Sequence, residues 1–427
     1  VRPARGRARL PASSRPARRV QMRVLFVHQD YPAQFGHVAR RLVSDLGWRC
    51  DFVSQLPAGE DGGVRLIQYR PEGSATAATH YCSRTFENAV WHAHAVYEAC
   101  ARQLRDAPDL VVGHSGLGST FFLRELYGCP VVNYFEYFYH TRASDLDFRP
   151  EFPPAPGDAL RARARNAVFL LDLDNCDAGY CPTEWQRTRF PAEYRPKLEV
   201  IFDGVDTRLW RRRENVPRRI GGRAVAADTR VVTYVARGLE AMRGFDIFMR
   251  VARRIYEAHP DVLFVVVGGD EIYYGPDRRF IQAESFRAHV LRGGDYDLSR
   301  FCFTGQIAPE RLSELLSLSD LHVYLSVPFV LSWSLFDALA CECVVLASDT
   351  APVREVITHG VTGLLADFYD VDGLARQALA VLRDPRAFRP LALAGAGLVR
   401  ERYGLDRTLP RHAEFFQRVA AGGARGR

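Results

Sequence analysis

Residues 231–271 read VVTYVARGLEAMRGFDIFMRVARRIYEAHPDVLFVVVGGDE, two short apolar runs that flank a segment of helical periodicity. The runs at 231–236 and 262–267 are predicted strands, and residues 245–258 between them are a predicted helix. Strands that alternate with helices in this way are typical of a parallel sheet covered by helices on both faces. This part of the chain therefore predicts an α/β fold.

The same alternation continues on both sides of this segment. On the N-terminal side we expect strands at 23–28, 50–53, 109–113, 130–133 and 198–202 and helices at 35–46, 86–104, 120–127 and 160–174. On the C-terminal side we expect helices at 310–318 and 332–340 and strands at 321–325 and 344–347. A polar, arginine-rich linker at 203–228 separates the two halves. We therefore expect two doubly wound domains, with ligands bound at the carboxyl ends of their strands in the cleft between them.

The excess positive charge lies at the N-terminal end of the chain. Of 57 Lys and Arg residues, seven arginines fall in residues 1–21, and the other 50 balance the 50 acidic residues. A near-neutral folded part does not suggest a nucleic-acid-binding surface. The only lysine is Lys197, so a P-loop NTPase would lack its motif lysine. We expect residues 1–21 to be a disordered tail and Met22 to be the start of translation.

The cysteine pattern and the hydropathy of the chain indicate its cellular compartment. The nine cysteines include no C-x-x-C pair, which argues against structural zinc and suits a reducing cytoplasm. The longest apolar run, at residues 321–336, is interrupted by polar residues and proline and is too short to cross a bilayer. We therefore predict a cytoplasmic protein with no transmembrane segment, which leaves peripheral membrane contact open.

Two arginines stand at the carboxyl end of the predicted strand at 231–236. Arg237 and Arg243 lie six residues apart around a turn marked by glycine. Arginine grips phosphate oxygens with two N–H groups and a fixed charge, so the pair could converge on a diphosphate. The alternative is a pair of solvated surface arginines, the common state of charged side chains.

A second candidate site lies in residues 328–348, PFVLSWSLFDALACECVVLAS. Ser332 or Ser334 can cap the predicted helix, whose free N–H groups and positive dipole end suit a phosphate. Asp337, about a turn inside, can accept two hydrogen bonds from a ribose diol. The alternative for Asp337 is a helix N-terminal charge that complements the dipole.

In order and spacing these segments resemble the retaining GT-B glycosyltransferases of the family-4, or group 1, type. Arg237 matches the arginine of the family's Gly-Arg-Leu…Lys-Gly motif, and Arg243 stands at the lysine of that motif. Asp337 takes the second place of the family's E-x7-E motif and is followed by Ala-Leu-Ala-Cys, where the family has Ala-Met-Ala-Cys-Gly. The segment VIFDGVD at 200–206 is similar to the family's VIPNGVD hinge. The resemblance covers about residues 22–419.

This resemblance implies a GT-B architecture, in which two Rossmann-like domains face each other across a cleft. By it, residues 22–203 form an acceptor-binding domain, residues 204–390 form a nucleotide-sugar-binding domain, and residues 391–427 form a helical segment that packs back on the N-terminal domain. It implies transfer of a sugar, with retention, from a nucleoside-diphosphate sugar to a hydroxyl of a glycan, lipid-linked or small-molecule acceptor. It also implies no metal and no further cofactor, since arginines and a helix dipole hold the diphosphate. Asp270 and Glu271 are therefore not taken as metal ligands.

The resemblance also places the donor side of the site. Arg237 and Arg243 would act as catalytic residues that neutralise the leaving diphosphate, and Asp337 would hold the ribose. The other donor-side residues are Gly238, Gly268, Gly269, Phe329, Ser332 and Ser334. Phe329 falls on the motif's first glutamate, which in the family contacts donor-sugar hydroxyls, and a phenyl ring cannot accept a hydrogen bond. This departure implies altered sugar recognition, and it keeps open a non-catalytic sugar-nucleotide-binding or glycan-binding relative.

The acceptor-side candidates lie in the N-terminal half. His114 follows the predicted strand at 109–113, where family members often carry a functional histidine, so the resemblance makes it catalytic; the alternative is a histidine with structural hydrogen bonds only. The other acceptor-side residues are His28, Phe35, Gly36 and Ser115. A remote alternative is an α/β-hydrolase with Ser115 as nucleophile, but the G-x-S-x-G elbow fails at Leu117.

Overall fold

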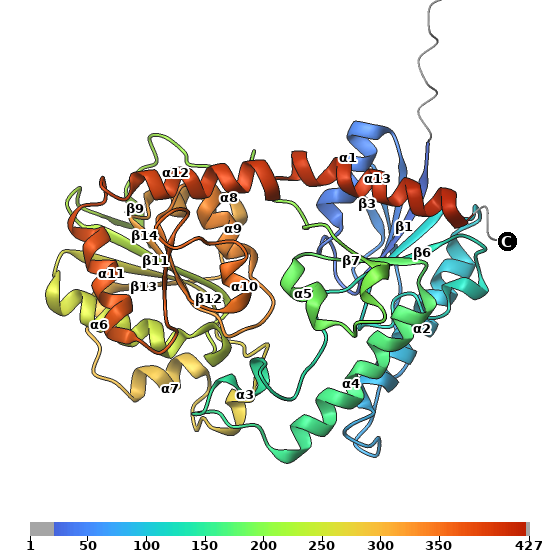
Figure 1. Cartoon of the computed structure of the whole chain (residues 1–427), viewed down its shortest axis with the longest axis horizontal. Helices are drawn as coiled ribbons and strands as arrows, with labels where there is room; N and C mark the ends of the chain where they lie inside the picture. The colour runs from blue at the N-terminus through green and yellow to red at the C-terminus, as the bar shows by residue number, and fades with distance from the viewer. Residues whose placement is uncertain (1–20, 424–427) are drawn as a thin grey trace, which may run out of the picture.

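The computed structural model describes residues 21–423, and within them the chain forms two α/β domains side by side (Figure 1). The N-terminal sheet has the order β3 (Gly59–Asp61), β4 (Val64–Gln68), β2 (Arg49–Ser54), β1 (Arg23–Val27), β5 (Leu110–His114), β6 (Val131–Tyr134), β7 (Ala178–Cys181) and β8 (Leu198–Val200). The C-terminal sheet has the order β13 (Phe301–Gly305), β12 (Val262–Gly269), β11 (Arg230–Gly238), β14 (Leu321–Tyr324), β15 (Val345–Ser348) and β16 (Leu364–Ala366). In these two sheets the neighbouring strands are parallel, except that β3 pairs antiparallel with β4. The prediction of two doubly wound domains is confirmed.

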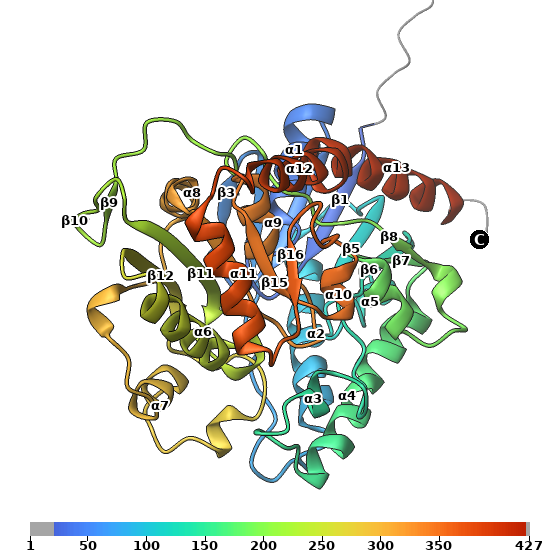
Figure 2. The same cartoon turned by 60° about the vertical axis from the view of Figure 1, so that its left-hand side comes forward.

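Helices cover both faces of each sheet (Figures 1 and 2). One face of the N-terminal sheet carries α1 (Gly36–Leu46) and α13 (Leu405–Gly423), and the other carries α2 (Arg84–Gln103) and α4 (Pro156–Asn175), with α5 (Glu184–Arg189) beside β7 and β8. One face of the C-terminal sheet carries α6 (Phe245–Ala258), α7 (Phe286–Arg292) and α11 (Val371–Arg383). The other carries α8 (Pro309–Leu318), α9 (Trp333–Ala340) and α10 (Ala351–Arg354), with α12 (Arg389–Leu398) beside α9.

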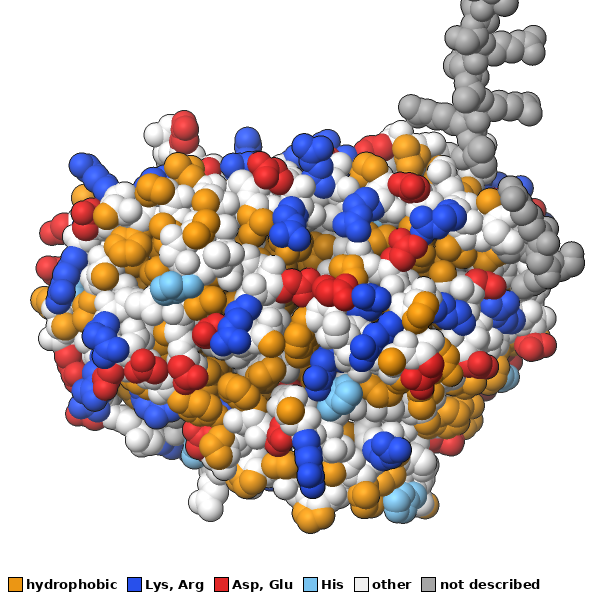
Figure 3. Space-filling view, viewed as in Figure 1, with side chains coloured by type: hydrophobic (Ala, Val, Ile, Leu, Met, Phe, Trp, Pro, Cys, Tyr) orange, Lys and Arg blue, Asp and Glu red, His pale blue; other side chains and the backbone are white. Residues whose placement is uncertain are grey.

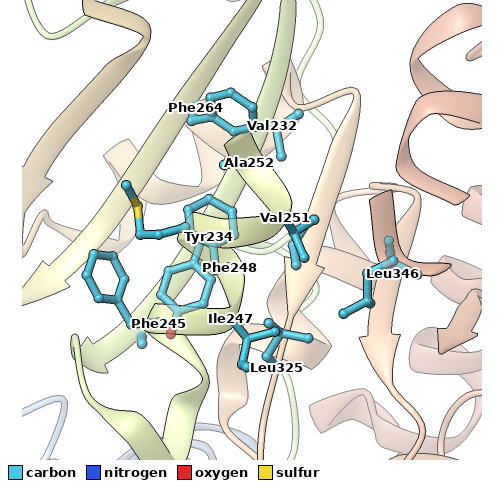
Figure 4. Packing of buried hydrophobic residues seen from close by; sticks show 14 of the residues in the cluster. Val232, Tyr234, Phe245, Ile247, Phe248, Val251, Ala252, Phe264, Leu325 and Leu346 are labelled. Carbon is cyan, nitrogen blue, oxygen red and sulfur yellow. The ribbon is translucent and has the colours of Figure 1, made fainter. Parts of the chain in front are cut away.

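The segment at 231–271 folds as its pattern predicts, into β11, α6 and β12. The apolar side chains of α6 pack on the sheet, where Phe248 stacks on Tyr234 with ring centroids 4.6 Å apart (Figure 4). Phe264 of β12 meets Phe248 edge-on at 6.2 Å. Gly244, at the start of α6, has φ +66° and no room for a side chain. Because buried apolar area contributes roughly 25 cal/mol per Å², this layer is a main source of stability for the C-terminal domain.

The prediction of a helix at 120–127 is wrong. This segment is irregular, apart from turns that include one 3-10 turn at Leu123–Glu125. Thr120 donates its hydroxyl to a buried asparagine of β6 at 3.0 Å. Gly118 has φ +73° and lies so close to α2 that a side chain would overlap its backbone. Contacts with other elements therefore outweigh the local helix propensity, which is a weak preference.

The chain crosses back to the N-terminal domain near its end. α12 packs against α9 of the C-terminal domain, and after a bridge between Val205 and Gly404 the chain continues as α13 over the N-terminal sheet (Figure 1). Leu409 and Phe416 of α13 join the core that holds Phe26 of β1. Of the segment expected to pack back from residue 391 onward, α12 therefore stays with the C-terminal domain. The return begins only at the bridge. In the expected linker, β9 (Arg219–Ile220) and β10 (Arg223–Ala224) form a short antiparallel hairpin.

A segment of the N-terminal half, residues 141–155, reaches across to the C-terminal domain and carries α3 (Asp145–Phe148), at the bottom of Figure 1. We call this segment the strap. Its anchor is Arg149, 4% exposed, whose guanidinium donates to the two carboxylate oxygens of Asp246 at 3.2 and 2.8 Å and to a backbone carbonyl before α6 at 2.7 Å. Phe152 of the strap belongs to the C-terminal core. The two domains are therefore joined by packed side chains as well as by the linker.

The surface carries charges of both signs. On the face shown in Figure 3, basic and acidic side chains are interspersed. Between residues 21 and 423, no helix combines the length and apolarity that a bilayer crossing needs. The tail expected to be disordered lies outside the described residues, apart from Gln21.

Candidate active site

The N-terminal wall of the site is formed at the carboxyl ends of β1, β5 and β6, where parallel strands present their last side chains at one edge of a sheet. His28 follows β1 and His114 ends β5, and their rings meet edge to face with centroids 5.0 Å apart. His114 Nδ1 lies 2.8 Å from the carbonyl oxygen of Ser115, which can only accept, so Nδ1 carries a proton. His114 Nε2 then faces the carboxylate of Glu136, 3.6 Å away.

Glu136, two residues beyond β6, was not singled out from the sequence. It accepts a hydrogen bond from Gln34 Nε2 at 3.3 Å. Burial acts to raise its pKa, but the hydrogen bond and charge of His114, with smaller contributions from Gln34 and from Arg243 of the other domain, hold the pKa below its ordinary value. An ionised carboxylate thus lies where the two domains meet. Its place just after a strand was the signal that could have found it.

His28 is a neutral imidazole at physiological pH. Burial, and then the charge of His114, lower the pKa of His28 to about 3, and its Nδ1 accepts the Asp30 N–H at 2.9 Å. Phe35 contacts both histidine rings from the core and is 1% exposed. Gly36 opens α1 at a point where a side chain would overlap the preceding loop. The structure places both Phe35 and Gly36 beneath the site rather than at its surface.

Ser115 is held in place by a hydrogen bond within the N-terminal domain. Its hydroxyl donates to Asp172 Oδ2 of α4 at 2.8 Å, and the same oxygen accepts the Gly116 N–H at 3.0 Å. Burial raises the pKa of Asp172 to about 7, with these two hydrogen bonds acting against the rise. No histidine in the described part of the chain bonds to the Ser115 hydroxyl, so the hydrolase alternative has no general base.

The two arginines predicted to hold a diphosphate stand in different surroundings on the C-terminal wall. Arg243, 8% exposed, donates from Nη1 to Ser326 Oγ at 2.9 Å and to the Val330 carbonyl at 3.1 Å. Arg237 is exposed, and its Cζ lies 4.0 Å from the ring centroid of Tyr273. Arg243 is therefore fixed from within its own domain, whereas Arg237 lies at the surface.

The loop after β12 carries Tyr273 and Tyr274 beside these arginines. Glu240 accepts the backbone N–H groups of both tyrosines, at 2.8 and 2.9 Å, and burial raises the pKa of Glu240 to about 7. The ring centroid of Tyr274 lies 5.6 Å from Arg243 Cζ. Burial raises the pKa of Tyr274, and the charges of Arg243 and Arg237 act against that rise. The positive charges of both arginines therefore act on the loop that carries Tyr274.

Phe329 joins the two domains through aromatic contacts. Its ring centroid lies 4.7 Å from that of Tyr137, on the N-terminal side, and 5.1 Å from that of Tyr274. Phe329 is 5% exposed, and Arg243 Cζ lies 5.8 Å from its ring centroid. An apolar ring therefore occupies the junction beside Arg243.

The start of α9 is capped by Ser332, one of the two serines predicted for that place. Its hydroxyl accepts the Ser334 N–H at 3.4 Å and the Ser334 hydroxyl at 3.0 Å. Asp337 lies about a turn inside the helix, 8% exposed, and burial raises its pKa well above the ordinary range. Within residues 21–423 its carboxyl group has no hydrogen-bond partner, so it is available to a ligand hydroxyl.

The donor-side glycines are required by the protein's own packing. A β-carbon on Gly238 would lie 2.2 Å from the carbonyl oxygen of Glu271, and one on Gly269 would lie 2.3 Å from Oε2 of the same residue. Gly268 has φ +155°, and a β-carbon there would lie 2.4 Å from the Ala236 carbonyl oxygen. The close approach of the ends of β11 and β12 accounts for all three glycines without a bound nucleotide.

Two more contacts join the domains around the site. Trp333 Nε1 donates to Asp203 Oδ2 at 2.9 Å, and burial raises the pKa of Asp203 to about 7. The Glu355 carboxylate accepts the N–H groups of Glu184 and Trp185 at the start of α5, both at 2.7 Å, where a negative charge is favourable. Neither contact was predicted, because each depends on how the domains dock.

Two Rossmann-like domains whose strand ends meet at an arginine-bearing site define the GT-B class of transferases. Residues 46–210 match the family described as "Glycosyl transferase family 4 group", and residues 221–392 match "Glycosyl transferases group 1". The chain belongs to the group 1 glycosyltransferases, a family of enzymes. The resemblance noted from the sequence is confirmed.

The relatives of this chain include transferases with different products. The D-inositol 3-phosphate glycosyltransferase of Thermobispora bispora is 25% identical over 402 residues, 89% of this chain and 87% of that protein. The N-acetyl-alpha-D-glucosaminyl L-malate synthase of Bacillus anthracis is 22% identical over 224 residues, 52% of this chain and 54% of that protein. The chain therefore spans about half the length of this second relative.

Solved structures share the fold at low sequence identity. The sucrose-phosphate synthase of Thermosynechococcus elongatus has a TM-score of 0.72 at 18% identity, covering 94% of this chain and 100% of that chain. Anabaena HepE, in complex with UDP and glucose, has a TM-score of 0.66 at 17% identity, covering 93% and 100%. These likenesses establish the GT-B fold.

Proposed function

We propose that the protein transfers a sugar from a nucleoside-diphosphate sugar to an acceptor hydroxyl, with retention at the anomeric carbon and without a divalent metal. Arg243 is the observation that carries the proposal. Its guanidinium is nearly buried where the domains meet, and its own domain fixes it through two hydrogen bonds. Negative charge grows on the leaving diphosphate in the transition state, and preorganised donors stabilise charge most effectively there.

Three features of the C-terminal domain support donor binding. Arg243, and Arg237 after release from Tyr273, would grip the diphosphate oxygens. The start of α9 offers N–H groups and the positive end of a helix dipole. The unpartnered carboxyl group of Asp337 would accept hydrogen bonds from the ribose diol, and these bonds would favour its ionised form against burial. The HepE complex with UDP and glucose supports a donor of this kind.

The N-terminal wall supports activation of an acceptor. Because His114 Nδ1 donates to a backbone carbonyl, Nε2 is the basic nitrogen, and it faces the Glu136 carboxylate. When the imidazole is in its neutral form, an acceptor hydroxyl beside this pair could lose its proton to Nε2, and the Glu136 carboxylate would stabilise the imidazolium that forms. Exclusion of water by the closed domains would protect the donor from hydrolysis.

A ligand panel tests this proposal. Nucleoside diphosphates and their sugars are screened by thermal shift, since a ligand at one hundred times its dissociation constant stabilises the protein by about 2.7 kcal/mol. With the stabilising donor, the anomeric configuration of the product is read by NMR, and EDTA should leave the rate unchanged. Stabilisation by no nucleoside diphosphate would overturn the function, and loss of activity in EDTA that manganese restores would overturn the metal-independent mechanism.

The phenyl ring at position 329 favours a second candidate function, that of a sugar-nucleotide-binding or glycan-binding protein without turnover. Residue 329 itself therefore offers a donor sugar no carboxylate oxygen to accept its hydrogen bonds. Binding of a nucleotide sugar with no consumption of the donor, in the presence of the acceptors tested, would establish this alternative.

A further inference from the structure

A pocket of about 600 Å³ lies between α4 of the N-terminal domain and residues 272–279 of the C-terminal domain. We call it the α4 pocket. Tyr139 lines it on one side and Met242, the neighbour of Arg243, on the other. The charge of Glu136 acts on the pKa of Tyr139, although burial is the main reason that this pKa is raised to about 12. The α4 pocket therefore adjoins the site that holds Glu136 and Arg243.

The lining of the α4 pocket is rich in arginine. Its charged residues are Arg161 and Arg165 of α4, Arg278 and Arg279 of the facing loop, and two acids, Asp145 and Asp158. Both acids are engaged within the protein. Asp158 pairs with Arg279 at 2.6 Å and with Arg161 at 3.6 Å, and Asp145 accepts the Tyr137 hydroxyl at 2.5 Å. Four arginines against two acids leave the pocket with an excess of two positive charges.

Among residues 21–423, Arg165 and Arg278 are the two lining arginines that form no ion pair within 4.0 Å. Arg165 lies with Cζ 4.2 Å from the ring centroid of Tyr139, and its buried Nε has no hydrogen-bond partner. A buried N–H donor without an acceptor is unfavourable, and an anion in the pocket would supply the acceptor. Arg278 faces the same space from the opposite domain and is exposed.

We propose that the α4 pocket binds the anionic group of the acceptor, so that the substrate class is a small hydroxylated anion such as a sugar phosphate or a hydroxy acid. The proposal rests on the glycosyl transfer proposed above. Arg165 and Arg278 hold the phosphate or carboxylate, one from each domain, and the hydroxyl of the same molecule reaches His114. A neutral acceptor would leave both arginines unpaired, which makes them residues that determine acceptor specificity.

The experiment is a calorimetric titration of the full chain saturated with UDP, so that the diphosphate site is already occupied. The probes are D-glucose 6-phosphate against D-glucose, and L-malate against 1,2,4-butanetriol, pairs that differ in charge but keep hydroxyl groups. We expect one or both anions to bind at least tenfold more tightly than the neutral partner, and the affinity to fall as salt is raised. Preference for the phosphate or for the malate identifies which anion the pocket takes.

Variants locate the binding in the pocket. Arg165→Gln and Arg278→Gln should each weaken binding of the anion at least tenfold. Arg163→Gln should leave it unchanged, because Arg163 is an exposed arginine of the same helix that does not line the pocket. UDP affinity should be the same in all three variants. Because Arg278 is exposed, its variant remains informative even if Arg165→Gln misfolds.

Failure of this proposal differs from failure of the proposed function. UDP binding without preference for either anion, or anion binding unaffected by Arg165→Gln and Arg278→Gln, would overturn the role of the α4 pocket and leave glycosyl transfer standing. Absence of binding by any nucleoside diphosphate would overturn glycosyl transfer, and the anion titrations would then be read on the protein without UDP.

Discussion

Arg243 is held by its own domain on one side and faces the proposed leaving diphosphate on the other. Arg243→Ala removes charge-assisted hydrogen bonds of roughly 1.5–3 kcal/mol, so we expect the dissociation constant of UDP, used as the probe of the proposed diphosphate site, to rise about 10- to 150-fold. Arg243→Lys should recover part of the affinity, since an ammonium restores the charge without the fork. Calorimetry at one salt concentration measures both, with Arg253→Ala, an exposed arginine of α6, as the control. Unchanged UDP affinity in Arg243→Ala would remove this residue from the donor site.

His114 should behave differently, because it stands on the opposite wall. His114→Ala removes the proposed base, so we expect turnover to fall about 100-fold or more while UDP affinity stays within twofold. Steady-state kinetics and UDP titration on one preparation separate the two effects. If UDP binding weakened in proportion to turnover, His114 would belong to the donor side.

Phe329 tests how the donor sugar is recognised. Phe329→Glu places a carboxylate near Arg243, where its charge is compensated, and it should change the ranking of UDP sugars by kcat/KM without changing UDP affinity. Phe329→Leu is the matched control, since it keeps an apolar side chain and should preserve the ranking. Identical kinetics for every donor in a well-folded Phe329→Glu protein would place residue 329 outside the sugar site.

At the scale of elements, Asp172 ties α4 to the turn after β5 and makes that tie depend on pH. Burial raises its pKa from 3.8 to about 7, so between about pH 4 and 7 the folded protein keeps a proton that the unfolded chain releases. The contribution of Asp172 to the free energy of unfolding therefore falls as pH rises through this window and is constant above it.

Asp172→Asn should remove that dependence, because an amide oxygen can accept the bonds from Ser115 and Gly116 without titrating. As pH rises from 5 to 8, we expect the free energy of unfolding of the variant, measured by urea denaturation, to increase relative to that of the wild type. Asp174→Asn, an exposed neighbour on α4, is the control and should follow the wild type. An equal pH response in wild type and Asp172→Asn would show that Asp172 does not carry the proton.

The elements that the sequence predicted well are those whose pattern reflects their own burial. β11, α6 and β12 follow from the apolar runs, as do the strand ends that bring His28 and His114 together. The prediction of a helix at 120–127 was wrong because contacts of Thr120 and Gly118 with neighbouring elements determine the local conformation. Glu136 could have been found from its place just after a strand, but its ionised state between two domains could not be predicted, nor could the stacking of Arg237 on a loop tyrosine, since both depend on tertiary docking.

At the scale of the whole molecule, Arg149 joins the strap to the C-terminal domain. Arg149→Ala leaves Asp246 and a backbone carbonyl without their donor, and breaking a buried pair on one side costs about 3–5 kcal/mol. Arg250→Ala is the matched control, because Arg250 contacts the same carboxylate at 3.7 Å but is half exposed and should cost less than about 1 kcal/mol. Urea denaturation measures both.

Small-angle X-ray scattering provides a second measurement on the same two variants, the radius of gyration. Because the strap holds the domains together, Arg149→Ala should give a larger radius of gyration than Arg250→Ala in the absence of ligand. Equal stability and equal size in the two variants would show that the strap does not restrain the domains.

The position of α13 bears on how the protein is made. Leu405, Leu409 and Phe416 complete the core beneath β1, yet they are synthesised about 200 residues after β8, the last strand of that sheet. At roughly 5–20 residues per second, the first sheet leaves the ribosome tens of seconds before its covering helix exists. During that interval one face of the nascent domain is incompletely covered, so the apolar side chains that α13 buries in the folded protein are exposed. A circular permutant that begins with α13 would supply the helix first and shorten that exposure.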